Sequence, residues 1–238
     1  MNIGMKQKPS NWNLKFFLRN NSALFFLFLL ALITALFFIF GFDRNALHLR
    51  INQSVGNPLL DTFFFYLTYL GDGAAATLIL LAILIYNVRL GLYATSSFLT
   101  ATLFSIFLKK VFFDDSNRPF FIFNYIDKHT LNLVKGVDMH IHNSFPSGHA
   151  TQAFSILICL AFFSSKNYMK FIFLILALLT SFSRVYLSQH WLVDVTAGSC
   201  IGFTFSVIYY FVFIANNKLE HFNTTLFNFR KAWVSPLK

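Results

Sequence analysis

The chain has 238 residues, of which 56% are hydrophobic and 19% aromatic, while only 12% are charged. A soluble domain of this length would not carry 34 Phe beside 19 basic and 9 acidic residues, so the composition predicts a single-domain, all-α polytopic membrane protein. The net charge of +10 is also common in nucleic-acid-binding proteins, but the placement of the charges described below excludes that class.

The first 21 residues form a polar, basic segment with an apolar side, which we expect to lie in the membrane interface before the first span. The apolar run 22–40 follows it. This run is longer than the hydrophobic core of a signal peptide, and residues 41–44 offer no small-residue cleavage pattern. We therefore predict an uncleaved first transmembrane helix.

Five further transmembrane helices are predicted along the chain. A polar loop at 43–60 precedes the second, at 62–86, which contains Gly71-Asp72-Gly73 and is therefore expected to kink or face protein there. The other four are expected at 90–108, 147–163, 168–187 and 191–215. The six-helix membrane domain thus covers 22–215, with an outer loop at 109–146 and a cytoplasmic tail at 216–238.

The charges are distributed unequally between the two sides of this arrangement. Six spans place both ends of the chain on one side, which carries eleven Lys and Arg residues and a single acidic residue, Glu220. The opposite side carries eight basic and eight acidic residues. This is the positive-inside pattern, with cytoplasmic termini, and it explains the basic character without nucleic acid. It predicts a multi-pass plasma-membrane protein, in a bacterium an inner-membrane one.

Three ionisable residues stand at the junction of the last two apolar runs, where the bilayer disfavours charge: Arg184, His190 and Asp194. If residues from 191 onward are helical, His190 and Asp194 lie one turn apart on one face. The carboxylate can then orient the imidazole and leave its other nitrogen free to attack, while Arg184 offers a planar fork of donors suited to phosphate. The alternative is an Arg–Asp pair that marks a helix end, with His190 as an interfacial residue.

The parity of the spans brings a second cluster to the same outer rim. Ser147, Gly148 and His149 open the fourth span, where backbone N–H groups and the positive end of the helix dipole favour an anion. A plain helix start, with Ser144 as the cap and Pro146 in the first turn, would explain the same residues.

A third cluster of the outer rim follows the third span. It holds Lys110 and Arg118, whose positive charges suit the oxygens of a phosphoryl group. Taken alone, Lys109 and Lys110 would be interpreted as lysines that reach toward lipid headgroups. The combination of three polar clusters on one side favours a phosphate site.

Together these residues resemble the type 2 phosphatidic acid phosphatase superfamily of membrane lipid phosphatases. The family pattern is Lys, six residues, Arg-Pro; then Pro-Ser-Gly-His; then Ser-Arg, five residues, His, three residues, Asp. The second part matches residues 146–149 and the third matches 183–194. The first part departs, because seven residues separate Lys110 from Arg118. The motifs cover about a fifth of the chain, and the six-span layout extends the resemblance over nearly all of it.

The resemblance implies a role for each residue. His190 would be the nucleophile that forms a phosphohistidine, Asp194 would orient it, and His149 would act as general acid and then as general base. The residues implied to hold the phosphate are Lys110, Arg118, Ser147, Gly148 and Arg184. No cofactor and no metal is implied. Asp138, His140 and His142 suggest a zinc site on their own, but we interpret them as part of a loop beside the headgroup pocket.

The implied function is hydrolysis of a lipid phosphate at the outer leaflet of the bilayer. Phosphatidic acid, phosphatidylglycerol phosphate, undecaprenyl diphosphate and the 1-phosphate of lipid A all fit the resemblance. Lys128, Lys135, His140 and His142 in the outer loop favour a bulky anionic headgroup such as that of lipid A. The alternatives are a lipid-to-lipid phosphotransferase on the same fold and a non-enzymatic transporter of anionic lipids, which the absence of inverted repeats disfavours.

The two cysteines are interpreted as part of the packing. Cys159 and Cys200 both fall inside apolar runs, where small, weakly polar side chains fill space between helices. We therefore expect neither a disulfide nor a metal site from them.

Overall fold

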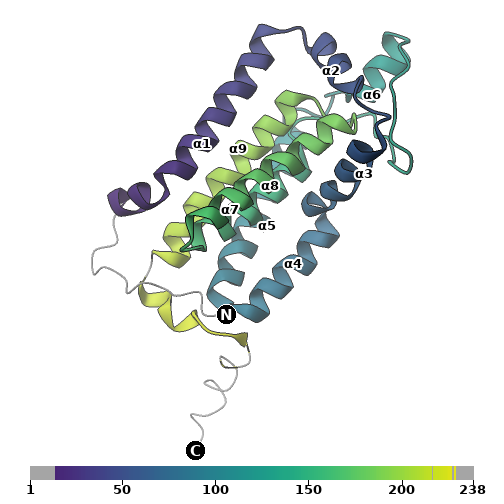
Figure 1. Cartoon of the computed structure of the whole chain (residues 1–238). Helices are drawn as coiled ribbons and strands as arrows, with labels where there is room; N and C mark the ends of the chain where they lie inside the picture. The colour runs from purple at the N-terminus through teal and green to yellow at the C-terminus, as the bar shows by residue number, and fades with distance from the viewer. Residues whose placement is uncertain (1–13, 216, 227, 229–238) are drawn as a thin grey trace, which may run out of the picture.

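The computed structural model describes residues 14–215, 217–226 and 228, and within these residues every regular element is helical. Long helices run side by side as a bundle, and the short helices α2 and α6 gather at one end of it (Figure 1). The all-α, membrane-type fold predicted from composition is confirmed.

The first long helix, α1 (Leu14–Gly41), is the outermost member of the bundle. It begins at Leu14 rather than at residue 22, because no Pro or Gly interrupts the chain there. Its start is held by Lys170, whose Nζ donates to Asn20 O at 2.9 Å and to Asn21 Oδ1 at 2.6 Å. The rest of the predicted interfacial segment, residues 1–13, lies outside the described residues.

The polar loop predicted at 43–60 is partly helical. Helix α2 (Arg44–Asn52) starts where the Asp43 carboxylate accepts the Ala46 N–H at 2.8 Å. Helix α3 (Pro58–Leu67) starts at the cap Asn57 and has Pro58 in its first turn. An Asp or Asn side chain thus caps the N-terminus of each helix, and in α3 the first turn also holds a proline, whose fixed φ suits that position.

The predicted interruption of the second span is confirmed. Helix α3 continues as η1 (Thr68–Gly71), and α4 (Gly73–Tyr86) leaves it at an angle of 61° after Asp72 caps its N-terminus. Gly71 is buried against α7, and a Cβ atom there would lie 2.6 Å from the carbonyl oxygen of His149. Only glycine allows this approach.

The core of the bundle is α7 (Gly148–Phe163), which packs against α5 (Val88–Val111), α8 (Asn167–Tyr186) and α9 (Leu192–Tyr209). The contact with α9 is close because α9 presents two glycines. A Cβ atom on Gly198 would lie 2.5 Å from Ser147 O, and one on Gly202 would lie 2.5 Å from Thr151 O. This packing places the first residues of α7 beside the first turn of α9.

The apolar helices occur in the order predicted. In the described part of the chain, four helices are long and apolar enough to cross a bilayer: α1, α5, α8, and α9 with its π-helical extension η3 (Tyr210–Ile214). The bent pair of α3–η1 and α4 makes a fifth unit, and α7, with 16 residues, is a shorter apolar helix enclosed by the others.

Besides α2, three short elements lie outside these apolar units. They are α6 (Pro119–Phe121) and η2 (Ile122–Ile126) in the predicted outer loop, and η4 (Asn217–Phe222) after the last long helix. Most of the predicted tail lies outside the described residues.

Candidate active site

A tight turn between α8 and α9 carries His190. The carbonyl of Arg184 accepts the N–H groups of both Gln189, at 2.9 Å, and His190, at 3.1 Å, and Ser188 has a positive φ of 53°. These bonds hold the turn so that the imidazole points into the bundle, where it is 2% exposed. Helix α9 then begins at Leu192.

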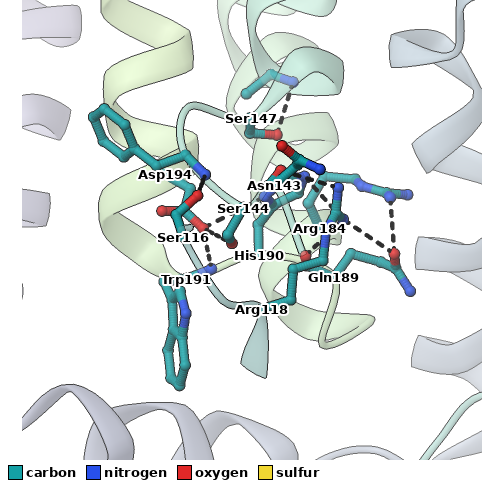
Figure 2. Close-up of polar contacts among 12 residues, drawn as sticks. Ser116, Arg118, Asn143, Ser144, Ser147, Arg184, Gln189, His190, Trp191 and Asp194 are labelled. Atoms are coloured by element: carbon teal, nitrogen blue, oxygen red, sulfur yellow. Dashed lines mark hydrogen bonds and ion pairs between the residues drawn. The ribbon is translucent and has the colours of Figure 1, made fainter. Parts of the chain in front are cut away.

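The imidazole of His190 faces the carboxylate of Asp194, one turn away. Their Nδ1 and Oδ2 atoms are 3.4 Å apart. The same Oδ2 accepts the Trp191 N–H at 2.9 Å and a short hydrogen bond from the Ser144 hydroxyl (Figure 2). Nδ1 makes no aligned hydrogen bond here, as is common for catalytic bonds before substrate binds.

The other imidazole nitrogen, Nε2, faces a guanidinium. Arg118 Nη1 lies 3.3 Å from it, and since arginine is only a donor, Nε2 must offer its lone pair. Burial, followed by the positive charges of Arg118, Arg184 and Lys109, holds the pKa of His190 well below its usual value. The imidazole is therefore neutral, with its proton on Nδ1 toward Asp194.

Arg118 is anchored by backbone carbonyls of the outer loop. Its Nε donates to His142 O at 2.9 Å, its Nη2 to Asn143 O at 3.4 Å, and its Nη1 to Gln189 O at 2.9 Å. Burial lowers the pKa of Arg118 to about 10, at which the group remains charged near neutral pH. The loop thus holds a fixed positive charge beside His190 Nε2.

Arg184, in the last turn of α8, adds a second guanidinium to the site. Its Nη1 donates to Thr68 Oγ1 at 2.9 Å and its Nη2 to Gln189 Oε1 at 3.4 Å, and its buried Nε has no hydrogen-bond partner. Gln189 Oε1 also accepts from Arg118 at 3.4 Å, so one amide joins the two guanidinium groups (Figure 2).

The N-terminus of α7 completes the cluster. Ser147 is the N-cap, with 0% exposure, and its N–H donates to Asp194 O at 3.0 Å. Ser144, considered above as the cap, instead bonds Asp194. Gly148 and His149 follow at the helix start, where N–H groups lack intrahelical acceptors. His149 is half-buried and interacts electrostatically with Arg184, His190, Arg118 and Lys109.

The structure places Lys109, rather than the predicted Lys110, toward the site. Lys109 is half-buried and interacts electrostatically with Arg118, Arg184 and Asp194. Lys110 is exposed. Successive residues of a helix point about 100° apart, so only one of two adjacent lysines can face a given cluster. The motif spacing favours Lys110, because Lys110 is one residue closer to the family spacing than Lys109. Spacing alone does not reveal which side of the helix a residue faces.

The outer loop folds over the cluster. Gln189 Nε2 donates to Asp138 O at 3.1 Å, and His142 Nδ1 lies 2.9 Å from Asn117 Oδ1. Burial, then the charges of Arg118 and Arg184, lowers the pKa of His140. Asp138, His140 and His142 do not gather with one another into a metal-binding group among the residues that the structure describes.

Sequence reasoning missed four residues of this cluster. The motif spacing selects Lys110 in place of Lys109. Gln189, Ser144 and Thr68 carry no motif signal that assigns them to an anion site. Gln189 could have been noticed, because it is the polar residue directly before His190. The partner of Ser144 depends on the path of the loop and has no sequence signal.

The fold and the site define a class of protein: an all-α, multi-pass membrane protein with a buried, carboxylate-paired histidine among converging cations. The chain belongs to the PAP2 superfamily, whose family model matches residues 90–218, more than half of the chain. This confirms the resemblance inferred from the three motifs. Among curated protein sequences, none matches significantly.

Two solved structures share the fold. The crystal structure of LpxE from Aquifex aeolicus is 29% identical, with a TM-score of 0.59 over 69% of this chain and 92% of that one. The crystal structure of a PAP2-type phosphatidylglycerolphosphate phosphatase from Bacillus subtilis is 21% identical, with a TM-score of 0.53 over 80% of this chain and 94% of that one. At that identity the second similarity shows the fold alone.

Proposed function

We propose that the protein hydrolyses the phosphomonoester or diphosphate of a membrane lipid through a phosphohistidine at His190. The observation that carries this proposal is the pair of contacts on one imidazole: Nδ1 lies 3.4 Å from Asp194 Oδ2, and Nε2 lies 3.3 Å from Arg118 Nη1. They leave a lone pair on Nε2 beside a fixed positive charge that can hold a phosphoryl oxygen.

In the first step, His190 Nε2 attacks phosphorus and forms an N–P bond while the bond from phosphorus to the lipid oxygen breaks. The proton that the leaving oxygen needs comes from His149, which must enter this step protonated. Asp194 stabilises the imidazolium character that develops on His190. Lys109 or Lys110, Arg118 and Arg184, with the first N–H groups of α7, would hold the phosphoryl oxygens.

In the second step, neutral His149 takes a proton from water, and the oxygen of that water attacks phosphorus. The N–P bond breaks, inorganic phosphate leaves, and His190 recovers its neutral form while His149 again carries a proton. The same residue serves as acid and then as base, as expected of the two halves of one displacement.

We place the site at the outer leaflet, because the excess of basic residues on the other side follows the positive-inside rule. The membrane domain would then cover 22–215, with the outer loop 109–146 above the site and the tail 216–238 in the cytoplasm. The protein would be a multi-pass plasma-membrane protein, in a bacterium one of the inner membrane.

For the substrate we favour a lipid with a bulky anionic headgroup, such as the 1-phosphate of lipid A. The outer loop supports this choice, because residues 138–143 fold around Arg118 and Gln189 and bring His140 near the cations of the site. Undecaprenyl diphosphate and phosphatidylglycerol phosphate are the next candidates.

The test uses purified full-length protein in detergent with each of these lipids. We expect release of inorganic phosphate without any added acceptor, and an acid-labile, alkali-stable label on the chain after rapid quenching with a radiolabelled lipid. His190→Ala should lose both, whereas His221→Ala, at an exposed site outside the cluster, should keep both. Full activity of His190→Ala would refute the proposal.

Two other outcomes would identify the alternatives. Phosphate transfer that requires a second lipid would make the protein a phosphotransferase. Saturable lipid binding without any covalent label would favour a transporter. For the substrate, lipid profiles of cells with and without the protein decide: an unchanged number of phosphates on lipid A would dismiss the favoured lipid.

A further inference from the structure

An apolar groove, made up of two neighbouring cavities, lies between α1 and the rest of the bundle. One cavity of about 260 Å³ lies between α1, α8 and α9, with Ala35, Phe182 and Val195 in its walls. A second, of about 150 Å³, lies between the end of α1, α2 and the turn before α9. Leu192 lines both cavities. The two cavities of the groove therefore extend from the middle of α1 to the end of the bundle that carries the site.

His48 lines the second cavity and carries a donor without an acceptor. Asn132 fixes the orientation of the Asn52 amide, since its N–H donates to Asn52 Oδ1 at 2.9 Å and its carbonyl accepts from Asn52 Nδ2 at 2.8 Å. Asn52 Nδ2 then donates to Ser188 Oγ at 3.3 Å, and that hydroxyl lies 3.1 Å from His48 Nε2. Ser188 Oγ has no other hydrogen-bond acceptor among the described residues, so its proton goes to Nε2 and the ring proton of His48 sits on Nδ1.

This Nδ1–H group is buried, since His48 is only 2% exposed, and it has no hydrogen-bond partner among the described residues. Burial lowers the pKa of His48 to about 4, so the ring is neutral at pH 7 and has a single N–H to offer. An unpaired buried donor destabilises the fold, and a carbonyl oxygen in the cavity would supply the missing acceptor.

A cation stands at the mouth of the same cavity. The Arg44 guanidinium lies over the Trp191 ring, 4.2 Å from its centroid, and is exposed. Among the described residues Arg44 takes part in no ion pair, and the neighbouring carboxylate of Asp43 is bonded to the start of α2. Arg44 is thus available to an anion that approaches from the headgroup region.

We propose that this groove binds one anionic glycerophospholipid of the bilayer as an accessory lipid, separate from the substrate. An acyl chain would lie between α1, α8 and α9, its ester carbonyl would accept the His48 Nδ1–H, and its phosphate would meet Arg44. The apolar walls, the His48 donor and the Arg44 cation follow one another along the groove. The acyl chain, the ester and the phosphate follow one another in the same order in such a lipid.

The occupant is separate from the substrate because the catalytic cluster lies elsewhere. Lys109, Arg118, His149, Arg184 and His190 line neither cavity. The groove nevertheless touches the catalytic turn, since His48 bonds Ser188, two residues before His190. A bound lipid therefore stabilises the turn that holds the nucleophile, and activity should depend on it.

The test measures retained lipid by native mass spectrometry of the full-length protein, released from nanodiscs of phosphatidylcholine with and without phosphatidylglycerol. We expect about one phosphatidylglycerol per chain for the wild type. Arg44→Gln should retain about tenfold less, the effect of one charge-assisted hydrogen bond, while Arg50→Gln, on the same helix outside the cavity lining, should behave as wild type.

A pair of His48 variants tests the donor itself. The amide nitrogen of Asn can replace Nδ1, whereas the amide of Gln replaces Nε2 and keeps only the bond to Ser188. His48→Asn should therefore retain phosphatidylglycerol and His48→Gln should lose it. The opposite order, or equal retention by both, would overturn the assignment.

A third pair of variants does not touch the polar network. Ala35→Leu fills the groove and should lower retention, whereas Ala82→Leu, exposed on α4, should not. Retention unaffected by Ala35→Leu would mean that the retained lipid does not occupy this groove, and would overturn the proposal. Displacement of phosphatidylglycerol from His190→Ala protein by an equimolar phosphorylated substrate lipid would show a substrate subsite, and would also overturn the proposal.

Discussion

Arg118 Nη1 lies 3.3 Å from His190 Nε2, the atom that we expect to attack phosphorus. The contact places a positive charge where equatorial phosphoryl oxygens would lie and at the same time requires an unprotonated nucleophile. Loop carbonyls at His142 and Asn143 hold the guanidinium in this position. The geometry of the nucleophile thus depends on a residue 72 positions away in the chain.

Replacing Arg118 by Lys should lower kcat/KM about 10²- to 10³-fold, although the charge is kept. Lysine is a point donor and cannot bond two loop carbonyls, Gln189 and the phosphoryl group together. Steady-state phosphate release measures the loss. Arg50→Lys, at an exposed position of α2, is the matched control. Activity within twofold of wild type for Arg118→Lys would contradict the role.

Lys109 and Lys110 should differ sharply in their effect on activity. Lys109→Ala removes a charge that interacts with Arg118, Arg184 and Asp194, and should reduce kcat/KM about 10²-fold. Lys110→Ala removes an exposed charge and should stay within about twofold. Both variants are assayed at the same salt concentration; a larger loss at Lys110 would restore the spacing-based prediction.

Ser144 acts on the reaction through Asp194. Without its hydroxyl, the carboxylate loses its shortest donor and holds the imidazole less firmly, so Ser144→Ala should lower kcat about tenfold and leave KM nearly unchanged. Ser144→Thr keeps the hydroxyl and should recover most of kcat. Ser165→Ala, at an exposed position beyond the other end of α7, provides the control. An altered KM with normal kcat would argue for a contact to substrate instead.

The close contact of α7 with α9 should tolerate no methyl group. In Gly198→Ala the new Cβ would lie 2.5 Å from Ser147 O, so the helices must separate, at a cost of about 1–3 kcal/mol. Separation also moves Ser147 away from Asp194, so both the melting temperature and activity should fall. Gly41→Ala, where nothing lies within 4 Å, should leave both nearly unchanged. An active, stable Gly198→Ala protein would show that the two helices can move apart without harm.

Stability should decrease as pH falls below about 6.5. Burial lowers the folded-state pKa of His48 to about 4 and that of His190 well below its usual value, while unfolded histidine titrates near 6.5. Below 6.5 the unfolded chain therefore binds more protons, and the stabilisation, complete above 6.5, is lost by about 1.4 kcal/mol per pH unit for each histidine. For His48 the loss ends near pH 4.

Melting temperatures between pH 8 and pH 5 in detergent measure this dependence. His48→Asn removes one titrating group and should flatten the curve, whereas His221→Asn should not, because His221 is exposed. A curve of the same slope in His48→Asn would show that His48 is not buried in the neutral form.

Much of the architecture was determined by the sequence itself. Runs of apolar residues long enough to cross a bilayer allow few arrangements, because backbone polar groups in lipid must be satisfied within helices. Gly71-Asp72-Gly73 indicated the break of the second span for the same reason. The predicted count of six crossings places the clusters around Arg118, His149 and His190 on one side, and the structure brings these residues together.

The tertiary structure decided which side chains act within that end. Whether Lys109 or Lys110 faces the cluster depends on the rotation of α5, and a shift of one residue turns a side chain by about 100°. The bonds of Ser144 to Asp194 and of Gln189 to two arginines depend on the path of the outer loop, which has no apolar periodicity to predict it. Hydrophobic burial thus specifies the helices, while directional contacts between segments far apart in the chain specify the site.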